Sequence, residues 1–190
     1  MRDGSATRKK LERCALNLFV EKGITATTIK DIANEAQIAE GTLYRHFKSK
    51  DELAQSLFVT SYEATIQSLN AIVSDSKNIA VQIKEMVEFF AQKFDEDPVL
   101  FRYLLLSQHN QVQYLSNDQN NAHYLLTEVV SEAMKNQLLP KEDPHIHAAI
   151  IMGIVLQSAL SRVYQRIQRK MVDDAPILTK AILRAIQAEA

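Results

Sequence analysis

The sequence predicts an all-helical protein of one or two domains, and three observations support this fold class. The chain has 190 residues, 46% of them hydrophobic, which is enough to bury one sizeable core and a small second one. Glycine and proline occur only four times each, so residues that break helices are scarce. Apolar residues recur at helical spacing over most of the chain, which predicts about nine helices.

Three helices are predicted near the N-terminus, and the second and third of them are short. Apolar residues at helical spacing within 11–19 predict the first helix, which Gly23 can end because glycine readily adopts a left-handed conformation. The second helix begins after Thr28, whose hydroxyl can cap free backbone N–H groups, with Asp31 in a capping-box position. The third predicted helix, residues 40–47, has only about two turns.

Longer helices follow. A capping box begins at Ser49, and the Asp-Pro pairs at residues 97–98 and 143–144 each provide an N-cap followed by a proline that suits the first helical turn. The apolar stripes predict helices that include residues 53–73, 83–94, 98–105, 122–134, 144–170 and 178–186, with a polar loop over 116–121.

Charge is unevenly distributed along the chain. The whole chain has a net charge of only −1. Residues 1–50 have ten Lys and Arg residues against six acidic residues, a net charge of +4, and the remaining residues have twelve against seventeen, a net charge of −5. This asymmetry favours an anion-binding segment on an acidic body, because neutralising phosphates requires only a local basic face. Chance is the alternative explanation.

Several classes of protein are not expected. The single cysteine, Cys14, excludes an internal disulfide framework and a cysteine zinc site, and favours an intracellular, cytoplasmic location. The N-terminus has no apolar signal segment, and the longest apolar run, Ala148–Leu156, is too short to cross a bilayer, so we expect no membrane association. His145 and His147 would diverge on a helix, so we expect no metal site. Without a nucleophile elbow, a glycine-rich phosphate loop or an obvious pair of catalytic carboxylates, we expect no enzyme, no catalytic residues and no cofactor.

Two short helices joined by a tight turn suit a helix-turn-helix better than a self-sufficient core. In that motif the first helix crosses the DNA backbone, and the N-terminal part of the second enters the major groove. The apolar residues that would hold the pair together are Ile29, Ile32, Ala33, Ile38, Leu43 and Phe47. The side chains that would point outward are Glu40, Thr42, Tyr44, Arg45 and His46.

Four motifs within residues 8–57 agree in register with one known family: Thr27-Thr28, Ile32-Ala33, the segment Gly41-Thr42-Leu43-Tyr44-Arg45-His46-Phe47, and Lys50-Asp51-Glu52-Leu53. On these residues the segment 8–57 resembles the DNA-binding domain of the TetR family of transcriptional regulators. This resemblance implies an N-terminal three-helix helix-turn-helix domain, residues 1–50, and a C-terminal helical ligand-binding and dimerisation domain, residues 51–190. Beyond residue 60 the resemblance is loose.

The resemblance also implies which residues contact double-stranded DNA. Threonine hydroxyls and backbone N–H groups at the start of the second helix suit a phosphate oxygen, and Lys50 adds a cation nearby. Gly41 allows close approach to the duplex, while Thr42 and Arg45 suit base edges, since arginine pairs bidentately with guanine. Taken singly, several of these residues are explained equally well as helix caps or solvated charges. The predicted contact set is Thr27, Thr28, Lys30, Glu40, Gly41, Thr42, Tyr44, Arg45, His46 and Lys50, with Tyr44 and His46 assigned to phosphates.

Three positions near the turn differ from what the motif usually has or favours. Gln37 stands where glycine is usual, so either a non-glycine residue adopts a positive φ or the turn has a different geometry. Ala39 stands where a capping serine is common, and a missing N-cap costs about 1 kcal/mol. Glu40 repels phosphate but can accept a hydrogen bond from cytosine, so it would restrict sequence more than it adds affinity.

For the C-terminal body the resemblance implies a small-molecule inducer bound among the middle helices and a homodimer formed through the last two long helices. Small residues in and near Ala148–Leu156 allow close packing, so we expect this segment to be buried against its own body and a partner. A pocket requires apolar walls and a few polar groups, although aromatic residues at helical spacing are also typical of an ordinary core. Candidate pocket residues of these types are Phe90, Phe94, Tyr103, Gln108, His109, Gln157 and Tyr164.

The sequence therefore predicts a ligand-responsive DNA-binding transcriptional regulator, a repressor released from a near-palindromic operator by a small molecule. The alternative is a DNA-binding adaptor or activator controlled by a protein partner, with an enzyme as the less favoured rival.

Overall fold

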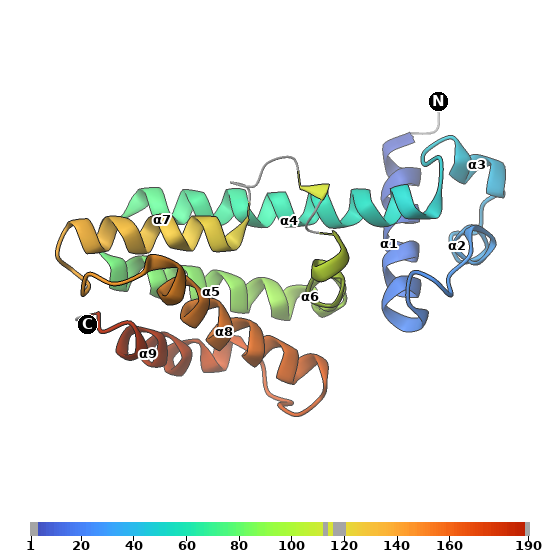
Figure 1. Cartoon of the computed structure of the whole chain (residues 1–190). Coiled ribbons are helices and arrows are strands. Elements are labelled where there is room, and N and C mark those ends of the chain that lie inside the picture. Colours follow the sequence, from blue (N-terminus) through green and yellow to red (C-terminus); the bar gives the residue numbers. More distant parts are fainter. Residues whose placement is uncertain (1–3, 112–113, 116–120, 189–190) are drawn as a thin grey trace. The chain divides into compact units, whose positions relative to one another are not determined.

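The computed structural model describes residues 4–111, 114–115 and 121–188, apart from the side chains of residues 109 and 110. This part of the chain contains nine α-helices and no strand, which confirms the all-helical prediction (Figure 1). The helices are α1 (Gly4–Lys22), α2 (Ile29–Glu35), α3 (Glu40–Tyr44), α4 (Lys50–Asp75), α5 (Ile79–Glu96), α6 (Pro98–Gln111), α7 (Ala122–Lys135), α8 (Pro144–Val163) and α9 (Ala175–Ala185), with a 3-10 turn η2 (Val172–Asp174) ahead of α9.

The chain forms two compact units. Unit 1 contains residues 1–62 and 99–114, so it combines α1, α2, α3, the N-terminal half of α4 and nearly all of α6. Unit 2 contains residues 63–98 and 115–190. These units divide within α4 and not at the predicted boundary after Lys50, because α6 packs into the N-terminal unit. The assignment of separate domains to residues 1–50 and 51–190 stays a prediction.

Unit 1 has a core built from every helix it contains. Leu11 and Phe19 of α1, Ile32 of α2 and Leu43 of α3 are buried, together with other apolar side chains of α4 and α6. Tyr103 of α6 is also buried. Its hydroxyl donates to the Ala54 carbonyl oxygen of α4 at 2.7 Å, and its ring stacks on Phe19 with centroids 6.1 Å apart. Burial raises the pKa of the Tyr103 phenol, so it remains a neutral donor. α6 is thereby joined to both α1 and α4.

Unit 2 is a group of packed helices in which α7 lies against α8, and α9 lies against α5 and α8 (Figure 1). The connection from α4 to α5 is fixed by Gln82, whose buried amide donates to the Val73 carbonyl oxygen at 2.9 Å and to the Ser76 carbonyl oxygen at 2.6 Å. Satisfying that buried amide matters, because an unpaired one would cost about 1–3 kcal/mol.

Two helix boundaries differ from the predictions. The predicted helix over 144–170 is wrong at its C-terminal end, because α8 ends at Val163 and Gln165 adopts a left-handed backbone with φ 57°. The third predicted helix is also too long, since α3 ends at Tyr44. Most of the predicted loop over 116–121 lies outside the described residues. Its last residue, Asn121, is the N-cap of α7.

Within the described residues, α8 is the one helix long and apolar enough, by length and composition, to cross a membrane. The short run considered in the sequence, Ala148–Leu156, is only part of this 20-residue helix. Helices in the core of a soluble protein can be equally long and apolar. Here Ala148, Ile151 and Val155 are buried, whereas Ala149 and Gly153 are exposed, so α8 has one covered and one open face.

Candidate functional site

A tight turn joins α2 to α3 and forms a helix-turn-helix in unit 1. Gln37 occupies the turn with φ 56°. Of the two options that the sequence left open, a non-glycine residue at positive φ is therefore the one observed. Its N–H donates to the Asn34 carbonyl oxygen, and the Ile38 N–H donates to the Ala33 carbonyl oxygen, both at 3.0 Å. This pair of hydrogen bonds is a Schellman motif, which ends α2 and starts the chain toward α3.

One face of α3 is buried and the other is open. Leu43, together with Phe47 just beyond the helix, packs into the core of unit 1, as predicted. Tyr44 is 53% exposed. Beyond its own stretch of α3, no atom lies within 4 Å of the position that a Cβ would take at Gly41. The predicted reading residues Glu40, Gly41, Tyr44 and Arg45 are exposed, and Thr42 and His46 are half-buried.

The N-terminus of α3 lacks a side-chain cap. Ala39 has the extended backbone of an N-cap, with φ −70° and ψ 142°, but its side chain accepts no hydrogen bond. The Ala39 carbonyl oxygen accepts from the Thr42 N–H at 2.8 Å. The sequence prediction of an uncapped third helix is therefore confirmed, and the free N–H groups of α3 remain available to solvent or to a ligand.

The start of α2 has the full capping box that the sequence predicted. The Thr28 hydroxyl accepts from the Asp31 N–H at 3.1 Å, and the Asp31 carboxylate accepts from the Thr28 N–H at 2.9 Å. The Thr28 backbone hydrogen bond, followed by its side-chain hydrogen bond, lowers the pKa of Asp31, so the carboxylate stays ionised at neutral pH. Thr28 and Lys30 are both exposed on the surface of α2.

Two residues of the predicted contact set are directed at the turn between α1 and α2, and of these Thr27 is buried and Lys50 half-buried. Thr27 is fully buried, and its hydroxyl lies 2.8 Å from the Gly23 carbonyl oxygen. Lys50, at the start of α4, donates from its ammonium to the Thr27 carbonyl oxygen at 2.8 Å and to the Thr25 carbonyl oxygen at 3.1 Å. Both side chains therefore hold the turn between α1 and α2.

Arg8 is a structural residue of the helix-turn-helix region that is absent from the predicted contact set. Its guanidinium lies over the Phe47 ring, 4.4 Å from the centroid, and donates to Glu12 at 2.9 Å and to Ser56 of α4 at 3.1 Å. The signal available in the sequence is the i, i+4 spacing of Arg8 and Glu12, but the contacts with Phe47 and Ser56 are long-range.

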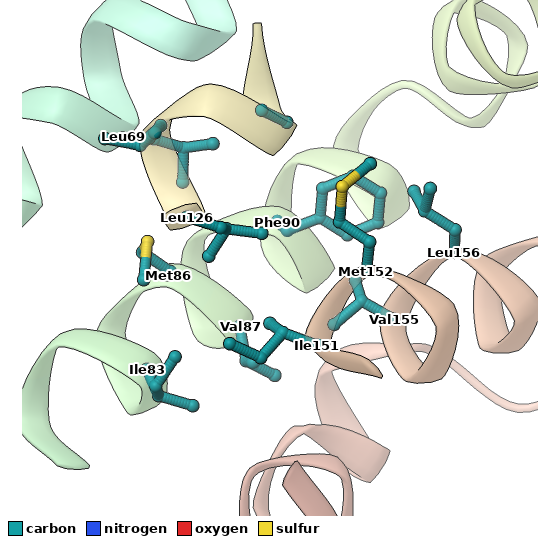
Figure 2. Close-up of a pocket in the computed structure, with 12 residues that line it drawn as sticks. Leu69, Ile83, Met86, Val87, Phe90, Leu126, Ile151, Met152, Val155 and Leu156 are labelled. Atoms are coloured by element: carbon teal, nitrogen blue, oxygen red, sulfur yellow. The ribbon is translucent and has the colours of Figure 1, made fainter. Parts of the chain in front are cut away.

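Unit 2 contains an apolar cavity of about 90 Å³ that α4, α5, α7 and α8 enclose (Figure 2). Figure 2 shows Phe90, Leu126 and Met152 extending toward one another from three different helices. Every lining residue is hydrophobic: Leu69, Ile83, Met86, Val87, Phe90, Ala122, Leu125, Leu126, Ile151, Met152, Val155 and Leu156.

The predicted pocket residues are dispersed. Phe90 is the one member of the predicted set that lines this cavity among the described side chains. Phe94 lines a different hollow at the end of α8, and Tyr103 is buried in unit 1. Gln157 and Tyr164 are exposed on or just after α8, Gln108 is half-buried on α6, and the side chain of His109 lies outside the described ones.

The helix-turn-helix with its open α3 face places this chain among DNA-binding transcriptional regulators. Residues 13–57 match the family model described as "Bacterial regulatory proteins, tetR family". This match covers α2, α3 and parts of α1 and α4. The N-terminal part of the chain therefore contains the DNA-binding domain of the TetR family of transcriptional regulators.

Individual relatives agree with this assignment. The transcriptional repressor KstR2 of Mycolicibacterium smegmatis is 40% identical over 53 residues, which are 28% of this chain and 26% of KstR2. The transcriptional regulator UidR of Escherichia coli K12 is 23% identical over 81% of this chain and 78% of its own. The structure of SmeT, repressor of a Stenotrophomonas maltophilia multidrug efflux pump, covers 97% of this chain and 92% of its own with a TM-score of 0.78 and 19% identity, a likeness of fold. SmeT has also been solved in complex with triclosan.

Proposed function

We propose that this protein is a homodimeric, cytoplasmic repressor that binds a near-palindromic operator and leaves it when an apolar small molecule occupies the cavity of unit 2. The open face of α3 carries the DNA-binding part of this proposal, because it combines exposed polar side chains with a buried apolar face that fixes their orientation. The fully apolar cavity carries the ligand-binding part.

In this proposal the DNA-reading face consists of the exposed and half-exposed members of the predicted set other than Lys50, whose ammonium is directed at the α1–α2 turn. Arg45 and Thr42 would read base edges, and Tyr44 would contact a phosphate. Gly41 supports close approach to the duplex, since the space beside its Cα is open. The remaining members of this face are Thr28, Lys30, Glu40 and His46.

The proposed dimer interface is the open apolar face of α8 and α9. Ile146 of α8 is 57% exposed and Ile177 of α9 is 62% exposed, although both are large hydrophobic side chains. Ala149 and Gly153 continue the stripe on α8, and Ala181 continues it on α9. Two neighbouring helices with exposed small and apolar residues suit an isologous helical interface.

The chemistry of the cavity indicates an uncharged or largely apolar ligand portion. None of its lining side chains carries a charge, so burying a charged group there would be unfavourable. A volume of about 90 Å³ is smaller than the engineered cavities of about 150 Å³ that hold benzene. A larger ligand therefore requires side chains to move, and Met86 and Met152 are suited to this because methionine is flexible.

Binding to DNA is tested with duplexes selected from a random library by the full chain. We expect Arg45→Ala and Tyr44→Ala to weaken binding at least tenfold, because both side chains lie on the open face of α3. Lys84→Ala on α5 is the control, since Lys84 is exposed on unit 2. Unchanged binding by both α3 variants would refute the proposed reading face.

Ligand control is tested by thermal shift with triclosan and a long-chain fatty acid as first probes, followed by a metabolite panel. A ligand that binds only the folded state raises the melting temperature. We expect at least one apolar compound to raise it and to release the selected duplex. No response across the panel would favour the alternative, a DNA-binding adaptor or activator controlled by a protein partner.

The dimer is tested at Gly153. Gly153 is exposed, and a Cβ added to it meets no atom within 4 Å beyond its own stretch of α8, so Gly153→Leu directs the new side chain outward from the protomer. We expect it to dissociate the dimer in sedimentation while helicity is retained. Gly153→Ala is the milder companion variant. A Gly153→Leu protein that remains dimeric would exclude this face as the interface.

A further inference from the structure

The turn between α1 and α2 is fixed from the inside by a threonine. Gly23 ends α1 with φ 84°, and its carbonyl oxygen accepts from the Thr27 N–H at 3.2 Å. The buried Thr27 hydroxyl lies 2.8 Å from the same oxygen and 3.3 Å from the Leu18 carbonyl oxygen. A buried hydroxyl must have a partner, so these contacts hold the turn against the last turn of α1.

The same turn is fixed from the other side by Lys50, the first residue of α4. Its ammonium donates to the Thr27 and Thr25 carbonyl oxygens at 2.8 and 3.1 Å, across 23 and 25 residues of sequence. A helix N-terminus disfavours a cation, so the ammonium needs partners at this position. Two of its three N–H donors are directed at the turn, which leaves one for any other acceptor.

We propose that Lys50 acts in DNA binding chiefly as a positioning residue. Its ammonium ties the α1–α2 turn to the start of α4 and so sets the orientation of the helix-turn-helix, and it is not mainly a phosphate ligand. Thr27 acts on the same turn from inside unit 1. This inference rests on the DNA-binding activity of the family and is separate from the proposed operator, dimer and ligand.

The two roles differ in their dependence on salt. A lysine that neutralises a phosphate releases a counterion, so removing it lowers the slope of log affinity against log salt by about 0.9. A positioning residue lowers affinity at every salt concentration and leaves that slope nearly unchanged. It also acts in the free protein, where its loss loosens the turn.

The experiment compares Lys50→Met with Lys30→Met in the full chain, with a duplex that the wild-type protein has selected from a random library. Both substitutions remove one ammonium, but Lys30 is exposed on α2. We expect Lys50→Met to bind DNA about tenfold more weakly than the wild type at every salt concentration from 50 to 200 mM. The slope of log affinity against log salt should stay the same. We expect amide hydrogen exchange of residues 23–28 to accelerate in the same variant without DNA. Lys30→Met is the reference, because Lys30 is a lysine that does not bind the α1–α2 turn. Amide hydrogen exchange of residues 23–28 in this variant should match the wild type.

Two further variants keep the inference testable if Lys50→Met folds poorly. Lys50→Arg retains a donor and a charge, and we expect it to recover most of the protection in residues 23–28. Thr27→Val has no change of charge, and we expect weaker DNA binding with an unchanged salt slope. A salt slope reduced by about one in Lys50→Met, or unchanged hydrogen exchange in residues 23–28, would overturn the proposal.

Discussion

Glutamine occupies the left-handed position after four helices. Gln37, Gln137, Gln165 and Gln187 have φ values of 56°, 61°, 57° and 57°. In each case the glutamine N–H and the following N–H donate to carbonyl oxygens of the last helical turn, which is the Schellman arrangement. A left-handed backbone is about 1–2 kcal/mol less favourable for an L-residue than for glycine. These four residues therefore lower stability while they end their helices.

The first prediction concerns Gln37, where glycine would adopt the same φ without strain. Gln37→Gly should raise the free energy of unfolding by about 0.5–1 kcal/mol, because relief of strain exceeds the added entropy of the unfolded chain. Denaturant unfolding monitored by circular dichroism measures this change. Gln67→Gly within α4 is the control and should lower stability by about 1 kcal/mol. A destabilising effect of Gln37→Gly would show that interactions of the Gln37 side chain stabilise the fold by more than its left-handed backbone destabilises it.

The second prediction concerns the uncapped N-terminus of α3. Ala39 already has the backbone geometry of an N-cap, so Ala39→Ser should add the missing acceptor and stabilise the protein by about 1 kcal/mol. Ala64→Ser, on an exposed position within α4, should instead lower stability slightly, since serine is a poorer helix former than alanine. Thermal unfolding of both variants measures the difference. Equal effects at the two positions would contradict the capping argument.

Among the elements, the end of α8 is joined to the start of α9 by buried charges. The side chain of Arg162 is 5% exposed and forms an ion pair with that of Asp174, which is 7% exposed. Arg162 also donates to the Ser158 hydroxyl at 2.8 Å and to the Arg169 carbonyl oxygen at 3.2 Å. The pair fixes the connection between the two helices that we propose as the dimer interface, so its geometry bears on that surface as well as on stability.

The third prediction removes one charge of this pair. Asp174→Asn leaves Arg162 buried beside a neutral amide, and we expect a loss of about 3 kcal/mol, because a buried charge without its partner is costly. Asp173→Asn is the matched control, since that neighbour is exposed and should change stability by less than about 0.5 kcal/mol. Urea unfolding compares the two variants. Similar small effects would show that solvent replaces the lost carboxylate.

Local signals determined which elements could be predicted from the sequence. The cap at Thr28 and the Asp143-Pro144 pair marked helix starts correctly, because capping depends on residues within one turn. The end of α8 was missed because Gln165 gives no glycine or proline signal, and the apolar spacing continues to Ile167. The contact of Lys50 with the α1–α2 turn could not be predicted, since its partners lie more than 20 residues away.

At the scale of the whole molecule, the candidate pocket was only partly predicted for the same reason: contacts between residues far apart in the sequence leave no local signal. Phe90 and Phe94 lie one turn apart on α5 and share its apolar stripe, yet only Phe90 lines the cavity. Which residue of a stripe faces a cavity depends on how neighbouring helices pack, which a single periodic pattern does not encode. Tyr103 has the right chemistry but belongs to unit 1.

The fourth prediction fills the cavity without a ligand. Val155 of α8 lines it, so Val155→Phe should occupy much of the available volume and abolish the thermal shift caused by any ligand that binds there. Val81→Phe, on an exposed position of α5, is the control and should retain the full ligand response.

Thermodynamic linkage makes this prediction quantitative. If a ligand lowers DNA affinity by some factor in the wild-type protein, the selected duplex must lower ligand affinity by the same factor. Ligand titrations with and without DNA measure both. We expect the two factors to agree in the wild type and in Val81→Phe, whereas Val155→Phe should bind DNA and show no response to ligand. A ligand that still releases DNA from Val155→Phe would place its site outside the cavity, because a ligand shifts an equilibrium only through its own difference in affinity for the two states.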